Sequence, residues 1–534
     1  MTTVAVTPAA NPVAEFASRH AGWLIGLGAL ALWEVAGDYN LVAGGALPSP
    51  SEIIRQIWLD RQYLPRHIGA TVWPALLGFL IGNTIAILAA ITFVLWPPVE
   101  RLTRGISITI FAIPAVALGP ILVLTVDGIK PMVVLAAVSV YFPTMIAMLV
   151  GLKDIDPRPV DLIRAYGGTR RHILLHVRLR SSLPSLLAGL KVAAPAAVLG
   201  AILAEFGSGQ RWGLGTYLLG SIGMGNPARI WEIGLIATAI ASIGYVAFAL
   251  IAGKATARTK QVTIASATPQ DLAGTGGFTP INIAYAVGAA VVPFIAWWGI
   301  MKWLDLSPII AKDPIGLWNY FFNARNSAVT QASLWDALLQ SVPIAFLGLA
   351  IGLAVAFGLA VLISTRPRIG NVFLPVALVT QTMPLVAWAP IIVLLFGRDL
   401  TTTLIIAASV TFFPALVTIL QGLSLVPRSA LDVLRTYGAS GAQQMRMVSI
   451  PSSIPYVMAA ARVAVPRALL GVMIAEWLAT GMGLGNLLNR ARGSLDYGMI
   501  WTVAFTSVAI SILFYQLVTV VERAFLKKYR AGSA

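Results

Sequence analysis

The sequence predicts an all-α integral membrane protein with about twelve transmembrane helices, built as two parallel six-helix repeats with pseudo-two-fold symmetry. Three observations support this fold class. Hydrophobic residues make up 58% of the chain and charged residues only 11%, whereas soluble domains carry about 25% charged residues. Apolar stretches of about 20 residues, the length that crosses a bilayer, recur along the whole chain. Finally, the stretch DLIRAYG at 161–167 returns as DVLRTYG at 432–438, 271 positions later.

The expected spans fall into two sets of six. In the first repeat, residues 21–260, they lie near 21–40, 69–95, 105–125, 130–151, 184–206 and 230–252. In the second repeat, residues 281–534, they lie near 283–303, 338–363, 372–396, 401–422, 455–479 and 499–520. Because six is an even number, both repeats run in the same direction. Parallel repeats place a pseudo-two-fold axis along the membrane normal, with the transport path near that axis.

The segments outside the spans complete the domain organisation. Residues 1–20 lack the basic start of a signal peptide and are expected to be a cytoplasmic tail. Residues 261–280 are rich in Gly, Thr and Pro, the composition of a linker. After the first span, a proline-bearing stretch capped by Ser51 predicts a short helix at the outer interface. This helix is either a structural spacer or a substrate contact.

The charge distribution indicates a partner class and a location. The net charge is +16, and Lys and Arg are more frequent on the side that the N-terminal tail shares. This positive-inside bias is typical of a multi-pass protein of the bacterial inner membrane, in contact with lipid and not with nucleic acid. The absence of cysteine excludes disulfides and thiolate metal sites. The four scattered histidines do not indicate a metal or catalytic site.

The most polar part of each repeat lies between its fourth and fifth spans, at 153–180 and 424–453. Asp161 and Asp432 are expected near helix starts, at the positive end of the helix dipole. The glycine that ends each motif permits a sharp turn. Each segment therefore predicts a helix–glycine–helix hairpin that projects into the cytoplasm.

The two hairpins are expected to be unequal. Pro451 follows the second hairpin, whereas Arg180 stands at the corresponding position after the first. Proline lacks an N–H group and disfavours helix in the residue before it. We therefore expect the hairpin at 157–180 to be longer than, or differently angled from, the one at 428–451.

The third span of each repeat carries two prolines six positions apart. Proline frees backbone carbonyl groups, which lipid tolerates only where protein or a water-filled path satisfies them. These spans either line the translocation path or contain a packing kink. The candidate path residues are Pro114, Pro120, Gln381, Thr382, Pro384 and Pro390.

Charged residues in the fifth spans leave alternatives open. Glu205 and Glu476 end these spans before glycine-rich loops. Each is solvated, contacts a substrate-binding protein or forms part of an outer gate. Lys191 and Arg462 occupy equivalent positions in the same spans. They either snorkel to the inner interface or face the axis and attract anions.

These motifs resemble the permeases of binding-protein-dependent ABC importers. Their pattern, Glu-Ala-Ala-x-x-x-Gly followed after nine residues by Ile-x-Leu-Pro, is similar to 161–179 and 432–451, although Asp replaces Glu and Arg180 replaces the first closing proline. Further segments resemble the nitrate/taurine/alkanesulfonate branch: 47–52, Ile113-Pro114, Phe142-Pro143, Ala204-Glu205, Met383-Pro384, Phe413-Pro414 and Ala475-Glu476. Members of that branch usually carry one such domain, whereas two are fused here.

The resemblance implies that the hairpins are coupling helices. Two ATPase subunits, which bind ATP and Mg²⁺, would dock on them at the cytoplasmic face, and an extracytoplasmic substrate-binding protein would deliver a small solute. The coupling residues it implies are Asp161, Arg164, Ala165, Tyr166, Gly167, Gly168, Asp432, Arg435, Thr436, Tyr437, Gly438 and Ala439. The chain has no phosphate-binding loop of its own, so we expect a transport subunit and not an enzyme. The branch includes importers of nitrate, sulfonates, taurine, bicarbonate and pyrimidine precursors.

The alternative is an ion-coupled secondary transporter with two six-helix halves. Such a carrier needs intramembrane acidic or ion-coordinating groups, and the spans hold few. It also provides no reason for two matched cytoplasmic hairpins.

Overall fold

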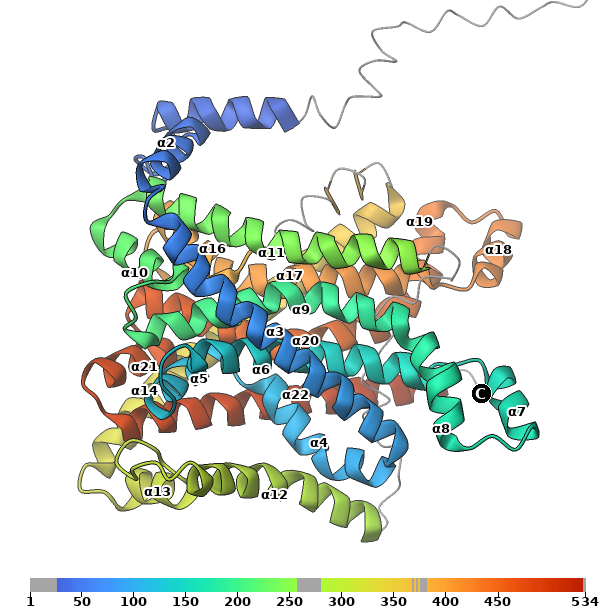
Figure 1. The fold of residues 1–534 in the computed structure, drawn as a ribbon. Helices are drawn as coiled ribbons and strands as arrows, with labels where there is room; N and C mark the ends of the chain where they lie inside the picture. The colour runs from blue at the N-terminus through green and yellow to red at the C-terminus, as the bar shows by residue number, and fades with distance from the viewer. Residues whose placement is uncertain (1–25, 257–279, 367–368, 371–372, 375–381, 532–534) are drawn as a thin grey trace, which may run out of the picture.

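The computed structural model describes residues 26–256, 280–366, 369–370, 373–374 and 382–531. These residues form helices and short connections, with no strand among them. The predicted tail at 1–20 and all of the predicted linker except Pro280 lie outside the described residues. Long helices run side by side between two ends of the molecule (Figure 1). The hairpin end carries α7, α8, α18 and α19, and the loop end carries α2, α10, α13 and α21.

The two repeats contribute similar, although not identical, series of elements. In the first repeat they are residues 26–38, α2 (Pro50–Asp60), α3 (Leu64–Leu95), α4 (Pro97–Ala112), α5 (Ala115–Thr125), α6 (Lys130–Lys153), α7 (Pro157–Ala165), α8 (Arg170–Ile173), a π-helical segment (Leu174–Arg178), α9 (Leu179–Ser208), α10 (Leu214–Met224) and α11 (Pro227–Thr256). In the second repeat they are α12 (Pro280–Trp303), α13 (Pro314–Trp318), a π-helical segment (Asn319–Asn323), α14 (Ser327–Thr365), α16 (Leu385–Phe396), α17 (Leu400–Ser424), α18 (Arg428–Thr436), α19 (Gly441–Gln444), a second π-helical segment (Met445–Ser449), α20 (Ile450–Ala475), a third (Glu476–Thr480), α21 (Gly483–Gly493) and α22 (Tyr497–Ala531).

The all-α membrane architecture is confirmed, whereas the number of twelve spans is not. Among the described residues, 8 helices are long and apolar enough to cross a membrane, or 9 if a bent pair is one span. Parts of the expected spans at 21–40, 283–303 and 372–396 lie outside the described residues or have side chains that are not described.

The third span of the first repeat, expected near 105–125, is broken into two half-helices. Residues Gly105–Ala112 and Ala115–Thr125 meet at an angle of 99°. Ile113 and Pro114 both adopt extended backbone, with ψ angles of 118° and 113°. Proline disfavours helix in its predecessor, so the chain leaves the helix at Ile113 and begins a new one after Pro114. Pro384 starts α16 in the same way, with ψ of 123°.

Equivalent helices of the two repeats make equivalent contacts, as expected for an approximate two-fold relationship. Within the repeats, α6 packs on α3 and α9, and α17 packs on α14 and α20. Between the repeats, α5 packs on α22, and α16 packs on α11. A hydrogen bond of 2.7 Å from Arg492 Nη1 to the Phe206 carbonyl also joins them. One apolar core, which includes Ile121 and Ile391, contains residues of both repeats.

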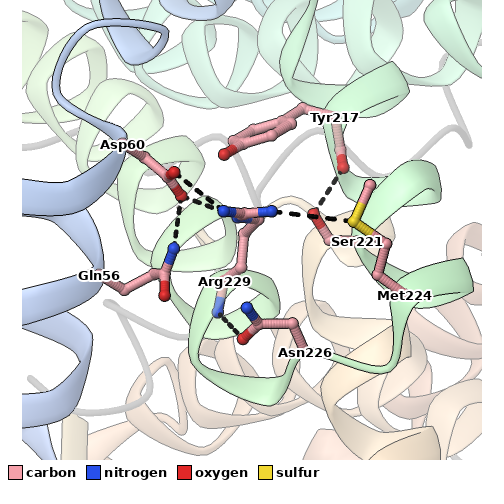
Figure 2. Close-up of polar contacts among 7 residues, drawn as sticks. All are labelled: Gln56, Asp60, Tyr217, Ser221, Met224, Asn226 and Arg229. Atoms are coloured by element: carbon pink, nitrogen blue, oxygen red, sulfur yellow. Dashed lines mark hydrogen bonds and ion pairs between the residues drawn. The ribbon is translucent and has the colours of Figure 1, made fainter.

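At the loop end, a polar network fixes α2 onto α10 and α11. Figure 2 shows Arg229 donating to Asp60 through Nε at 2.7 Å and Nη2 at 2.9 Å, while Gln56 donates to the same carboxylate at 2.7 Å. The N-cap of α2 is Ser49, not the expected Ser51, because Ser49 Oγ accepts from the Glu52 N–H. The second repeat replaces this ion pair by a hydrogen bond from Tyr320 to Asp496 at 2.9 Å.

Candidate functional site

The first hairpin is a short helix closed by a glycine turn. Its helix α7 begins at Pro157 and is capped by Asp156, whose side chain accepts from the Arg158 N–H. Asp161 therefore lies in the middle of the helix, not at its start, and pairs with Arg164 at 3.4 Å. This corrects the expected position of the motif aspartate, because proline and Asp156 supply the start signal four residues earlier.

Gly167 ends α7 in the left-handed conformation, with φ of +75°. The Gly168 N–H donates to the Ile163 carbonyl at 2.8 Å, and the Gly167 N–H donates to the Arg164 carbonyl at 2.9 Å. These two bonds define a Schellman C-cap, which glycine favours because it has no Cβ.

The second hairpin repeats this geometry. Gly438 has φ of +74°, the Ala439 N–H donates to the Leu434 carbonyl, and Asp432 pairs with Arg435 at 3.1 Å. Both glycine turns are followed by a capping box, a four-residue helix and a π-helical segment.

The expected difference in hairpin length is wrong. The long helices α9 and α20 begin at Leu179 and Ile450, which are 271 positions apart like the motifs themselves. Pro451 lies in the first turn of α20, where an absent N–H costs little. The π-helical segment before it also forms in the first repeat, which has no proline there.

Both hairpins lie at one end of the molecule (Figure 1), and each carries exposed apolar side chains. Tyr166 is 86% exposed and Tyr437 is 85% exposed. Leu162 and Val433, one helical turn earlier, are also exposed. Of the other predicted coupling residues, Arg164, Ala165, Arg435 and Thr436 are exposed, whereas Gly168 and Ala439 are partly buried. Matched exposed aromatic residues are typical of a surface that binds a protein partner.

Each hairpin is continuous with a span of the membrane core. Residues Arg170–Ser208 and Gly441–Thr480 form single candidate spans, so the second arm of each hairpin is the end of the fifth span itself. Arg178 Nη1 also donates to the Leu152 carbonyl of α6 at 3.0 Å. The first hairpin is therefore connected directly to both the fourth and the fifth span.

A cavity of about 1040 Å³ lies between the two repeats. Thr382 and Pro384, two of the predicted path residues, line it. Pro114, Pro120 and Pro390 are buried and do not belong to its wall, although Ile113 and Ala115 beside Pro114 do. Those three prolines shape the half-helices instead of facing the cavity. Gln381 lies outside the described residues.

Glu205 and Glu476 are buried, with exposed fractions of 1% and 2%, so a solvated position for either is wrong. Glu205 accepts hydrogen bonds from the Thr71 hydroxyl at 2.6 Å and from the Gly215 N–H at 2.5 Å. Glu476 accepts from the Ser341 hydroxyl at 2.6 Å and from the Gly485 N–H at 2.8 Å. A soluble protein cannot reach these carboxylates in this conformation.

Each glutamate instead joins three parts of its repeat. Thr71 Oγ1 also accepts from the Leu214 N–H at 2.8 Å, and Ser341 Oγ accepts from the Leu484 N–H at 2.8 Å. We call these arrangements the glutamate staples: each ties the second span, the fifth span and the glycine-rich loop together. Sequence reasoning missed the hydroxyl partners, although polar residues at matching positions in two apolar spans were the available signal.

Lys191 and Arg462 have different surroundings despite their equivalent positions. Arg462 is 2% exposed and forms an ion pair of 2.9 Å with Glu522 of α22, so it does not snorkel to the interface. Lys191 lines the cavity between the repeats.

Comparisons with known proteins agree with this geometry. Residues 82–261 and 348–530 each match the family described as binding-protein-dependent transport system inner membrane component. The chain is 33% identical over 153 residues to the riboflavin transport system permease protein of Chloroflexus aurantiacus, covering 29% of this chain and 57% of that relative's length.

Two other relatives match over more of their length. The formylaminopyrimidine transport permease protein of Halalkalibacterium halodurans is 27% identical over 43% of this chain and 90% of its own length. The putative aliphatic sulfonates transport permease protein of Escherichia coli is 30% identical over 37% of this chain and 76% of its own. Each match covers less than half of this chain, as expected if it contains two such domains.

Proposed function

The chain belongs to the family of binding-protein-dependent transport system inner membrane components, and from this premise we propose that its two repeats form the two halves of one translocation path, with one ATPase subunit docked on each hairpin. It is a permease subunit of an ABC importer in the bacterial inner membrane, a transport component and not an enzyme. Permeases of this kind work with an ATPase and a substrate-binding protein. The proposal adds the stoichiometry, the docking residues and the path.

The exposed tyrosines at the hairpin turns support the proposal that the hairpins couple to the ATPase. Tyr166 and Tyr437 stand at matching positions on matching turns, and both are largely exposed among the residues that the structure describes. An ATPase groove that buries each tyrosine removes this apolar area from water, which stabilises docking. ATP and Mg²⁺ bind to the partner, and closure of the two ATPase subunits moves the hairpins together.

The cavity between the repeats supports the proposal that the translocation path runs between them. It lies between the repeats, and its wall includes residues of the half-helices after Pro114 and Pro384. Because α5 and α16 each pack on the last span of the other repeat, a relative motion of the repeats changes the shape of this cavity. A binding protein delivers a small solute at the loop end of the molecule. The glutamate staples hold the glycine-rich loops in place at that end. The solute belongs to the nitrate, sulfonate, taurine, bicarbonate or pyrimidine-precursor class.

The test removes both tips and measures coupling. The double variant Tyr166→Ser/Tyr437→Ser, in proteoliposomes with its ATPase and binding protein, is expected to lose copurifying ATPase and stimulated ATP hydrolysis. Tyr39→Ser is the matched control, because Tyr39 is 74% exposed and lies in the segment before α2. Normal ATPase binding and solute import by the double variant would contradict the docking proposal.

The same assay separates the importer from an ion-coupled carrier. Solute uptake is expected to require ATP and to persist when ion gradients are abolished. Uptake that follows an ion gradient without ATP would favour the carrier.

A further inference from the structure

We propose that Lys191 and Arg467 make the cavity between the repeats a binding site for an organic anion with an apolar, planar body. This inference rests on the proposed function, from which it takes the cavity as the path of the solute, and it narrows the class of that solute. Neither residue belongs to the hairpins or to the glutamate staples.

The cavity wall carries positive charge without a negative counterpart. Lys191 of α9 and Arg467 of α20 both line it, and none of its described lining residues is Asp or Glu. The sequence between 367 and 381, which precedes α16, contains no acidic residue either. An anion that enters this cavity therefore meets two cations and no repelling carboxylate.

Neither cation forms an ion pair within the described part of the chain. Arg462 provides the contrast, because Glu522 neutralises it at 2.9 Å in the same helix pair, α20 and α22. A charged side chain inside a membrane protein is costly unless it is paired or faces a watered cavity. Lys191 and Arg467 line the cavity, so an anion bound there would supply the negative charge that pairs with them.

The two cations come from opposite repeats and lie at different levels along the axis of the fifth spans. The repeat relationship places Arg462 opposite Lys191, and Ala196 opposite Arg467, in each case 271 positions away. Arg467 therefore lies five residues farther toward the loop end than the counterpart of Lys191, a stagger of about 7.5 Å along a helix. An anion that leaves one cation thus remains within the field of the other as it crosses.

The rest of the wall indicates the body of the anion. Aromatic side chains line the cavity, among them Phe111, Phe142, Tyr245 and Trp388. Phe111 and Phe142 stack with ring centroids 4.2 Å apart. Apolar walls with a few charged or polar groups bind small molecules by burying their body and orienting their charge. A bare inorganic ion would leave this aromatic surface unused.

The test measures binding to the full chain in lipid nanodiscs, without ATPase, binding protein or ATP. Three probes are titrated by calorimetry: benzenesulfonate, its neutral analogue benzenesulfonamide, and nitrate. The variants are Lys191→Gln and Arg467→Gln. The matched control is Lys254→Gln, which removes an exposed cation from the hairpin end of α11.

The unmodified chain is expected to bind benzenesulfonate at least about tenfold more tightly than benzenesulfonamide or nitrate. Lys191→Gln and Arg467→Gln are each expected to weaken benzenesulfonate about tenfold and to leave benzenesulfonamide unchanged. Lys254→Gln is expected to behave like the unmodified chain.

A second readout reports the charge of the cavity directly. Trp388 lies in the wall, so the part of the fluorescence that Trp388→Phe removes comes from inside the cavity. Iodide is expected to quench this component more strongly than caesium. Lys191→Gln and Arg467→Gln should lower the iodide quenching and leave quenching by neutral acrylamide unchanged, which also shows that the variants remain folded.

Failure of benzenesulfonate to bind, or binding and iodide quenching within about twofold of the unmodified chain in both variants, would overturn the anion site. Nitrate binding as tight as that of benzenesulfonate would contradict the proposal that the bound anion has an organic body. Because no ATPase is present, these outcomes are separate from those of the coupling test: intact anion binding with failed coupling would contradict only the importer proposal.

Discussion

Single residues at the two hairpin turns show how closely the repeats match in their local chemistry. Gly167 and Gly438 both adopt positive φ, and the space around each is open, so backbone conformation alone requires glycine there. The next position differs, because a Cβ at Gly168 would contact the Ile163 side chain and carbonyl. The second repeat has Ala439 at that place together with Leu434, which is not branched at Cβ.

Gly167→Val and Gly438→Val are expected to weaken coupling without preventing insertion. A β-branched residue in the left-handed region costs about 1–2 kcal/mol, which shifts the turn away from the native conformation. The measurement is ATP hydrolysis stimulated by loaded binding protein, and Gly441→Ala is the control because Gly441 lies in the same hairpin without positive φ. Transport at the control's rate in both valine variants would exclude the hairpins as coupling elements.

Asp60 and Arg229 predict a pH dependence of stability at the loop end. Burial alone would raise the pKa of Asp60, but hydrogen bonds from Arg229 and Gln56 outweigh it and hold the pKa below its ordinary value of 3.8. The ion pair therefore contributes fully above pH 3.8, and its contribution is lost as the pH falls through the lower pKa of the folded protein.

Asp60→Asn is expected to destabilise the protein by about 1–3 kcal/mol at neutral pH, because Arg229 loses a charged partner. The difference from the unmodified chain should shrink below pH 3.8. Thermal unfolding in detergent across this pH range checks both statements. Asp38→Asn is the control, since Asp38 is exposed. A destabilisation that is the same at every pH would contradict the ion-pair explanation.

At the scale of elements, the glutamate staples explain how short glycine-rich loops are held at the ends of long helices. Each carboxylate accepts from a hydroxyl of the second span and from an N–H of the loop. A Cβ at Gly213 or Gly483 would contact this carboxylate, so the close approach requires glycine. The staples thereby fix α10 and α21 relative to the cavity.

Glu476→Gln is expected to loosen the second loop, because an amide has one acceptor oxygen where the carboxylate has two. A buried hydrogen bond contributes about 0.5–1.5 kcal/mol, so exchange of the Gly485 amide should accelerate about twofold to tenfold. Hydrogen exchange with mass spectrometry measures this, with Glu52→Ala on the exposed side of α2 as control. Unchanged exchange at 483–485 would show that the staple does not hold the loop.

The sequence predicts the elements better than their contacts. The repeated motif and its glycine place both hairpins, because a turn with positive φ leaves a local signature. The 99° break at Ile113 is not predictable in the same way, since a proline inside an apolar stretch is compatible with either a kink or a break. Burial of Glu205 and the pairing of Arg462 with Glu522 depend on residues more than 50 positions away, which tertiary packing alone brings together.

At the scale of the whole molecule, two repeats of one design line a cavity with unequal sides. The half-helices α5 and α16 exchange partners across the pseudo-two-fold axis, and the hairpins coincide in length. The cavity is nevertheless asymmetric, because Lys191 lines it whereas its counterpart Arg462 is paired with Glu522, and because Arg467 has Ala196 as its counterpart. Fusion into one chain permits this asymmetry, whereas a homodimer would carry every cation twice.

Native mass spectrometry of the purified complex tests the central claim most directly. If the two fused repeats supply both halves of the path, the intact complex contains one copy of this 56.6 kDa chain and two ATPase subunits, one for each hairpin. A complex with two copies of this chain would contradict the account, because each repeat would then pair with its equivalent in a second copy.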